Sequence, residues 1–166
     1  MSTRIEAIDT RSAPEETLRA LHELYLTRDL ELEPAGDPPV PFGQRLVDWR
    51  NTLESDSIPR WALWKGTEIV ATSGVFMDLV QNLANALGWV YVHPGHRGNG
   101  HGRALATPMF DTIQADGRVR FATEMNQGRP EEVIARAAGM KAAYTEKRSR
   151  LSFPDVDWSL MEKWVK

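Results

Sequence analysis

The chain has 166 residues, a length typical of one domain with a sizeable hydrophobic core. Its net charge is −3, which argues against a basic nucleic-acid-binding surface. The absence of cysteine excludes disulfides, thiolate metal ligands and an acyl-cysteine intermediate. No segment approaches the roughly 20 apolar residues needed to cross a bilayer, and the N-terminus lacks a signal-peptide pattern. We therefore expect a cytoplasmic protein with neither nucleic acid nor membrane as a partner.

Short strands and helices are predicted for the first part of the chain. Residues 4–8 alternate polar and apolar side chains, which predicts a strand. Ser12, followed by a proline and two glutamates, is typical of a helix start, and apolar spacing extends that helix to about residue 30. A proline-rich loop over 33–41 then leads to a second predicted helix over 42–53.

Strands joined by tight turns follow. We expect them over residues 61–64, 68–80 and 83–92, with turn residues between each pair. Strands joined in this way are antiparallel, so most of the sheet should be antiparallel.

Helices and strands alternate in the remainder. A helix should follow the glycine-rich segment to about residue 116, and Pro108 within it should kink it or restart it at Thr107. The later elements are a strand over 119–125, a helix over 130–138, strands within 140–153 and a tail helix capped by Asp155 or Asp157.

The most informative segment, VHPGHRGNGHGRAL, covers residues 92–105. It joins a β-rich run to a helical pattern. Glycines let backbone N–H groups converge, and the first turn of a helix offers unpaired donors at the positive end of its dipole. Arg97 and Arg103 add positive charge. Unless the glycines serve only to tighten a turn, the segment predicts a site for a phosphate or another anion.

Its spacing excludes two common phosphate-binding motifs. A dinucleotide fingerprint would need glycine where Arg103 stands, and a P-loop would need a lysine after the glycines. What remains is V-x-P followed by R-x-x-G-x-G, formed by Val92, Pro94, Arg97, Gly100 and Gly102. This pattern resembles the signature of the GNAT superfamily, the acyl-CoA-dependent N-acetyltransferases, whose loop cradles the pyrophosphate of coenzyme A.

The order of predicted elements over about residues 3–153 is similar to the GNAT order. The resemblance implies an α/β (α+β) fold with a mixed, mostly antiparallel twisted sheet of about six to seven strands flanked by helices. Two central strands should splay into a V-shaped opening. Gly88 is either a bulge that opens this strand or a point of close packing.

The resemblance divides the chain into an acyl-CoA-binding domain over residues 1–153 and a tail helix over 154–166. Residues 146–157 are also similar to the end of the first unit in actinobacterial proteins that carry two GNAT units in tandem. The tail then either connects to a second GNAT unit or packs on its own domain or on a twin subunit in a homodimer.

By resemblance, acetyl-CoA is the cosubstrate. The residues expected to bind it are Val90, Val92, Arg97, Gly98, Asn99, Gly100, His101, Gly102 and Arg103. A backbone donor near Val92 should bond the acyl carbonyl, which gives Val92 a catalytic role. No metal is expected, because His93, His96 and His101 have no carboxylate or cysteine neighbours; His96 and His101 either contact phosphate or lie in solvent.

The groups that move protons depart from the family pattern. Many GNAT enzymes place a tyrosine general acid at the position of Ala135, four residues before Gly139-Met140. Tyr144 lies beyond that glycine on a predicted strand and should not inherit the role. Glu124, acting through water, is the first candidate base and Asp78 the second; each has an outward-facing structural alternative.

Two functions follow. The first is transfer of an acetyl group from acetyl-CoA to a primary amine by direct attack in a ternary complex. The alternative, favoured by the missing tyrosine, is a weak or inactive acyl-CoA-binding domain with a sensing or structural role. Glu31, Glu33 and Asp37 hint at a cationic acceptor, and Trp49 and Trp61 are candidates to line its pocket or to pack in the core.

Overall fold

The structure, a computed structural model, describes residues 2–32, 38–146, 154 and 156–164. Contacts divide the chain into two compact units, Met1–Asn126 and Gln127–Lys166. The first contains β1 (Thr3–Ile8), α1 (Glu15–Leu32), α2 (Phe42–Arg50), β2 (Asp56–Ser57), β3 (Arg60–Lys65), β4 (Glu68–Asp78), β5 (Asn85–Val92), the 3-10 helix η1 (Pro94–His96), α3 (His101–Ala115) and β6 (Arg120–Ala122). The second contains α4 (Pro130–Ala137) and α5 (Trp158–Trp164).

The first unit is built on one sheet of six strands among the residues that the structure describes. The strands lie in the order β1-β3-β4-β5-β6, and β2 pairs separately with β4. Every pair is antiparallel except β5 and β6, which are parallel. The predicted mixed, mostly antiparallel sheet is therefore confirmed, and the reason is the short connections, residues 66–67 and 79–84, that join β3, β4 and β5.

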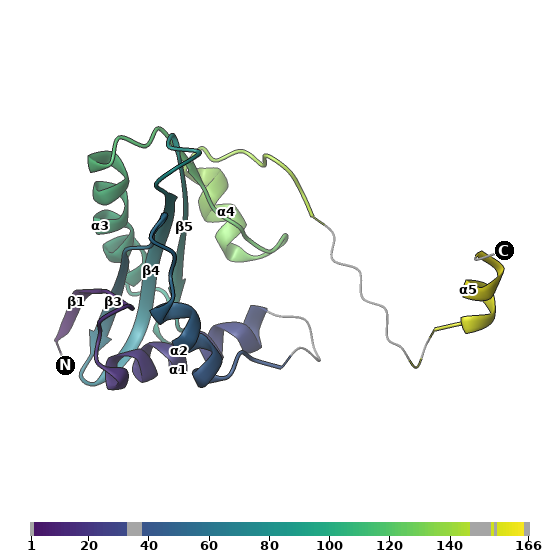
Figure 1. The fold of residues 1–166 in the computed structure, drawn as a ribbon. Helices are drawn as coiled ribbons and strands as arrows, with labels where there is room; N and C mark the ends of the chain where they lie inside the picture. The colour runs from purple at the N-terminus through teal and green to yellow at the C-terminus, as the bar shows by residue number, and fades with distance from the viewer. Residues whose placement is uncertain (1, 33–37, 147–153, 155, 165–166) are drawn as a thin grey trace. The chain divides into compact units, whose positions relative to one another are not determined.

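Helices cover both faces of this sheet, as Figure 1 shows for α3 on one side of the strands. Apolar side chains of α1 and α2, including Leu18, Leu21 and Trp49, pack against β1, β3, β4 and β5 in one core cluster. On the opposite face, Leu105, Met109 and Ile113 of α3 pack in two further clusters against the sheet. The i, i+4 spacing of these three residues puts them on one side of the helix, which explains how α3 lies against the strands.

Helix α3 runs unbroken through Pro108, so the predicted restart at Thr107 is wrong. The Thr107 hydroxyl instead donates to the Arg103 carbonyl at 3.3 Å, and the Thr112 hydroxyl donates to the Pro108 carbonyl at 2.9 Å. Met109, next to the proline, is 2% exposed. Burial of the apolar face on the sheet stabilises the helix enough to offset the one intrahelical bond that proline removes.

Several predicted bounds change. α2 ends at Arg50, the short β2 was not foreseen, and β6 ends at Ala122 rather than residue 125. Residues 140–146, predicted to begin the last strands, have no regular structure, and residues 147–153 lie outside the described chain. A strand needs a hydrogen-bonding partner. The described part of the second unit has only α4 and α5 as regular elements, so residues 140–146 find no partner strand there.

The tail helix α5 begins where the sequence predicts. Asp157 Oδ1 accepts hydrogen bonds from the backbone N–H of Ser159 at 3.0 Å and of Leu160 at 3.3 Å. This is an N-cap, so Asp157 fulfils the predicted capping role, while Asp155 lies outside the described residues. In the described part of the chain, no helix combines the length and apolar character needed to span a membrane.

Candidate active site

The parallel pair of β5 and β6 separates part-way along β5. The two strands pair from Asn85↔Arg120 to Leu87↔Ala122, where β6 ends. Beyond this point β5 keeps its β4 partner as far as Ala71↔Val92. Among the described residues of the first unit, no strand lies on its other side. One edge of residues 88–92 is therefore left with backbone groups that no strand pairs, as a V-shaped opening requires.

Gly88, which lies where β5 and β6 separate, is a point of close packing. A Cβ added there would lie 2.5 Å from Phe121 Cε2 and 3.1 Å from Met109 Sδ. The register between β4 and β5 passes through the Val75↔Gly88 pair without a shift. The bulge interpretation is therefore wrong, and the missing side chain lets Phe121 and Met109 approach the strand.

The glycine-rich loop continues from this free edge into α3. It begins with η1, where His93 Nδ1 accepts a hydrogen bond from the Gly95 N–H at 3.1 Å. Gly98 and Gly100 have φ angles of 80° and 76°, a left-handed conformation that glycine adopts without strain. Gly100 immediately precedes α3, whose first N–H groups have no intrahelical acceptor. A Cβ on either glycine would meet nothing within 4 Å, so the space over the loop is open. The loop presents donors and the positive end of a helix dipole to that space.

Arg97 does not simply extend from the loop into solvent. Its Nη1 and Nη2 donate to the two Glu31 carboxylate oxygens at 2.9 and 2.6 Å, and its Nε donates to the Val92 carbonyl at 3.1 Å. Glu31 also accepts from the Tyr91 hydroxyl at 2.9 Å. Burial raises the pKa of the Tyr91 hydroxyl, and the bond to Glu31 raises that pKa further. This bidentate pair joins the C-terminal end of α1 to the loop. Glu33 and Asp37, the other two carboxylates that hint at a cationic acceptor, lie outside the described residues.

A cavity of about 420 Å³ lies on the α1–α2 face of the sheet. Its lining residues are Tyr25, Arg28, Arg45, Asp48, Trp49, Thr52, Ile58, Arg60 and Trp89. Trp89 belongs to the part of β5 that β6 does not cover, directly before Val90, and its indole N–H donates to the Tyr25 hydroxyl at 3.2 Å. Trp89 is therefore the residue that this cavity shares with the uncovered part of β5.

The sequence pointed to Trp49, but it did not indicate the polar side chains that line this cavity, such as Arg45 and Arg60. Trp61, the second predicted lining residue, instead packs against two core clusters. Alternation along β3 places Arg60 and Trp61 on opposite faces of the sheet, which explains the difference. Because Arg60 and Trp61 are adjacent in the sequence, their positions alone do not indicate which of the two faces the cavity.

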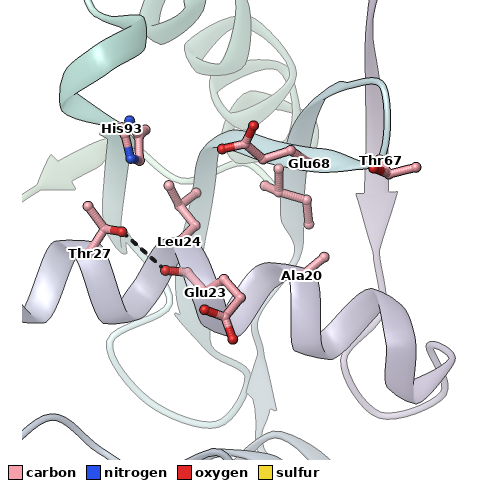
Figure 2. Close-up of a pocket in the computed structure, with 8 residues that line it drawn as sticks. Ala20, Glu23, Leu24, Thr27, Thr67, Glu68 and His93 are labelled. Carbon is pink, nitrogen blue, oxygen red and sulfur yellow. Dashed lines mark hydrogen bonds between the residues drawn. The ribbon is translucent and has the colours of Figure 1, made fainter.

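A second cavity, of about 300 Å³, lies between α1 and the β3–β4 turn. Figure 2 shows Ala20, Glu23, Leu24 and Thr27 along α1, with Thr67 and Glu68 across from them and His93 beside Thr27. The Thr27 hydroxyl donates to the Glu23 carbonyl at 3.3 Å. Two carboxylates and no arginine or lysine line this cavity, so it is poorly suited to a phosphate.

A family model described as Acetyltransferase (GNAT) family matches residues 18–131. The chain belongs to the GNAT acetyltransferase family. No curated protein matches the sequence.

Solved structures share the GNAT fold at low sequence identity. A tandem GNAT protein from the clavulanic acid biosynthesis pathway has 17% identity and a TM-score of 0.67 over 83% of this chain and 43% of its own. An aminoglycoside acetyltransferase from an uncultured soil metagenomic sample has 19% identity and a TM-score of 0.61, covering 92% of this chain and 100% of its own. Glucosamine-6-phosphate N-acetyltransferase from Arabidopsis thaliana has 14% identity and a TM-score of 0.60 over 92% and 100%. The chain thus spans less than half of the tandem protein.

Within this GNAT fold, the candidate proton-transfer residues lie at separate places. Glu124 is exposed and follows the end of β6. Asp78 accepts hydrogen bonds from the N–H groups of Gln81 and Val80, both at 2.8 Å, and these bonds lower the pKa of its carboxyl. Asp78 therefore caps the β4–β5 turn, which is a structural role.

The second unit holds the residues around the family's tyrosine position. Ala135 is a buried residue of α4. Tyr144 is 70% exposed and lies in a segment without regular structure, so its predicted strand is wrong. Within the described residues, no group of three or more histidine, aspartate or glutamate side chains is arranged to hold a metal ion.

Proposed function

We propose that this GNAT domain transfers an acetyl group from acetyl-CoA to the primary amine of a small acceptor. The observation that carries the proposal is the free edge of β5 leading directly into a glycine loop at the N-terminus of α3. Backbone donors for a thioester and backbone donors for a phosphate are then adjacent on one segment of chain.

The loop is suited to the pyrophosphate of coenzyme A through its backbone. The residues proposed to hold the pyrophosphate are Arg97, Gly98, Asn99, Gly100, His101, Gly102 and Arg103. Asn99 stabilises the turn itself, because its side-chain amide donates to the carbonyls of His96 at 3.1 Å and Arg97 at 3.2 Å. Val90 and Val92 lie on the free strand edge and are proposed to meet the pantetheine and the thioester.

The transfer requires one bond to form and one to break. The amine nitrogen attacks the thioester carbonyl carbon, the carbon–sulfur bond breaks, and sulfur leaves with the electron pair. The nitrogen loses a proton and the thiolate gains one, so the products are an amide and free coenzyme A. A backbone N–H near Val92 is proposed to stabilise the negative charge that develops on the carbonyl oxygen, which gives Val92 its catalytic role.

Glu124 is proposed to accept the amine's proton through water. Its exposure at the end of β6 keeps it accessible to both water and an ammonium substrate. Glu124→Gln should then lower turnover about a hundredfold and leave acetyl-CoA affinity unchanged, whereas Glu54→Gln, at another exposed glutamate, should match the wild type. If the Glu124 variant follows the wild-type rate at every pH, the amine arrives neutral and Glu124 is not the base.

A weak or inactive acyl-CoA-binding domain is the second candidate, because Ala135 stands where many GNAT enzymes carry a tyrosine. It predicts acetyl-CoA binding without release of free thiol. We also propose residues 1–153 as the acyl-CoA domain, and residues 154–166 as a tail that reaches either a second GNAT unit or a twin subunit. The proposed location is the cytoplasm.

Thermal unfolding with acetyl-CoA and a free-thiol assay with a panel of amines test the function together. Acetyl-CoA at about one hundred times its Kd should stabilise the fold by roughly 2.7 kcal/mol. Gly100→Glu places a side chain and a negative charge over the loop and should abolish that shift. Gly66→Glu is the matched control, since Gly66 also has a left-handed φ of 66° and open space but lies in the β3–β4 turn. Equal shifts in the two variants would show that the loop does not bind the cosubstrate.

A further inference from the structure

Three arginines line the cavity that contains Trp89 of β5: Arg28, Arg45 and Arg60. Two of them share one buried carboxylate. Asp29 Oδ1 accepts from Arg28 at 2.9 Å, and Asp29 Oδ2 accepts from Arg45 at 2.5 Å. Asp29 therefore balances one positive charge of this pair and leaves the other uncompensated by it. Among the residues that line the cavity, Asp48 is the one carboxylate; it is exposed and accepts a hydrogen bond from the Gln44 side-chain amide at 3.3 Å.

Arg60 is the least compensated of the three. It is 9% exposed, and its Nη1 donates to the Thr10 hydroxyl at 2.9 Å and to the Ile58 carbonyl at 3.5 Å. Its Nε is buried without a hydrogen-bond partner, as is the Nε of Arg45. Within the described chain, no carboxylate forms an ion pair with Arg60. A buried guanidinium with an unused donor is costly unless an anion satisfies it.

Strand pairing places Arg60 in line with Trp89, which belongs to the part of β5 proposed to meet the thioester. Its cross-strand neighbour on β4 is Gly74, and the neighbour of Gly74 on β5 is Trp89. Directly paired residues project from the same face of a sheet, so all three belong to the cavity side. Trp89 lies across Gly74, because a Cβ on this glycine would be 2.3 Å from Trp89 Cζ2. The Arg60 guanidinium carbon lies 5.7 Å from the centroid of the Trp89 ring.

This alignment sets the distance between Arg60 and the free edge of β5. Two strand spacings separate β3 from β5, or about 10 Å, and the Arg60 side chain shortens that distance by reaching toward Trp89. A molecule that lies over Trp89 can place an anionic group at Arg60 and an amine at the edge of β5. Trp49 adds a second aromatic wall to the cavity.

We propose that the acceptor is a zwitterionic amine, and that Arg60, with the free donor of Arg45, binds its carboxylate or phosphate. This inference rests on the acetyl transfer proposed above and names the substrate class for it. The anionic group satisfies the buried guanidinium, the body of the molecule packs on Trp89, and the amine extends to the thioester. Amines without an anionic group leave Arg60 unsatisfied and bind weakly.

Calorimetric titration of the full chain with matched ligand pairs tests this. The pairs are glucosamine 6-phosphate against glucosamine, and lysine against 1,5-diaminopentane; the members of each pair differ only in the anionic group. In at least one pair, the anionic member should bind at least tenfold more tightly. Arg60→Met should remove that preference, Arg60→Lys should keep part of it, and Arg4→Met, at an exposed arginine of β1, should keep all of it.

Equal affinities within both pairs, or a preference that survives Arg60→Met, would overturn the inference. The wild-type comparison decides alone if Arg60→Met does not fold, and the acetyl-CoA-induced thermal shift reports whether that variant is folded. The pairs distinguish a phosphate from a carboxylate as the bound group. Failure of the proposed function is separate: it is recognised by the absence of an acetyl-CoA shift, whereas the ligand pairs are compared without acetyl-CoA.

Discussion

Gly74→Ala should destabilise the protein through a single, identifiable contact. A Cβ at this position would lie 2.3, 2.8 and 2.9 Å from Cζ2, Cη2 and Cε2 of Trp89. Carbon atoms in contact are ordinarily about 3.5–4.0 Å apart, so the indole must move by roughly 1 Å or more. That movement breaks the 3.2 Å hydrogen bond from Trp89 Nε1 to the Tyr25 hydroxyl.

The magnitude follows from these two losses. Overpacking of this kind costs about 1–3 kcal/mol, and the lost hydrogen bond adds about 0.5–1.5 kcal/mol. Replacing glycine by alanine returns about 0.4–1 kcal/mol by restricting the unfolded chain. The free energy of unfolding should therefore fall by about 2–3 kcal/mol, which lowers Tm by roughly 5–10 °C in a chain of this size.

Urea denaturation followed by far-UV circular dichroism measures this difference. Gly43→Ala is the control, because Gly43 lies in α2 and a Cβ there meets nothing within 4 Å. It should leave stability unchanged or raise it by up to about 1 kcal/mol. A Gly74→Ala variant within about 0.5 kcal/mol of the wild type would refute the reasoning. So would an equal cost of Gly74→Ala in a Trp89→Leu background, since the clash would then not involve the indole.

Three further predictions concern separate parts of the chain. His22 is 5% exposed, and its burial, aided by Arg45, lowers the pKa of its imidazole, so stability should be lost as pH falls below about 6.5; His22→Gln should flatten that loss in urea titrations at pH 7.5 and 5.5. Arg118 is 7% exposed and donates to the carbonyls of Asp78, Asn85 and Asn82 at 2.8, 3.0 and 3.4 Å and to the Asp116 carboxylate at 2.6 Å. Arg118→Met should therefore lower the free energy of unfolding by about 2–4 kcal/mol, while a change of under about 0.5 kcal/mol, as expected for Arg120→Met, would contradict it. Tyr144→Phe should leave turnover in the free-thiol assay nearly unchanged; a loss of about a thousandfold, or roughly 4 kcal/mol, would identify Tyr144 as the general acid.

Much of the architecture could be predicted because its causes are local. Short connections between β3, β4 and β5 determine that these strands are antiparallel, and the apolar spacing of Leu105, Met109 and Ile113 determines the buried face of α3. Local patterns did not predict features that depend on contacts with distant parts of the fold. Pro108 predicts a kink or a restart of α3, but packing on the sheet stabilises a helix without a restart, and β6 ends at Ala122 rather than at residue 125.

The partner of Arg97 was also beyond the reach of local reasoning. The loop that contains Arg97 is contiguous, so its glycine spacing can be read directly from the chain. Its carboxylate partner, Glu31, lies 66 residues away, at the end of α1. Only the packing of α1 on the sheet brings Glu31 and Arg97 together.

The sequence by itself determined the GNAT family, the glycine loop and most of the elements of the first unit, because each depends on neighbouring residues or short periodicities. Only the tertiary structure decided which side chains form the cavity lined by Arg60 and Trp89. Arg60, Gly74 and Trp89 come from three strands, and their common face depends on register, where a shift of one residue would turn each side chain to the opposite side of the sheet. The position of Arg60 beside Trp89 is a consequence of strand pairing, and strand pairing is a long-range property of the folded chain.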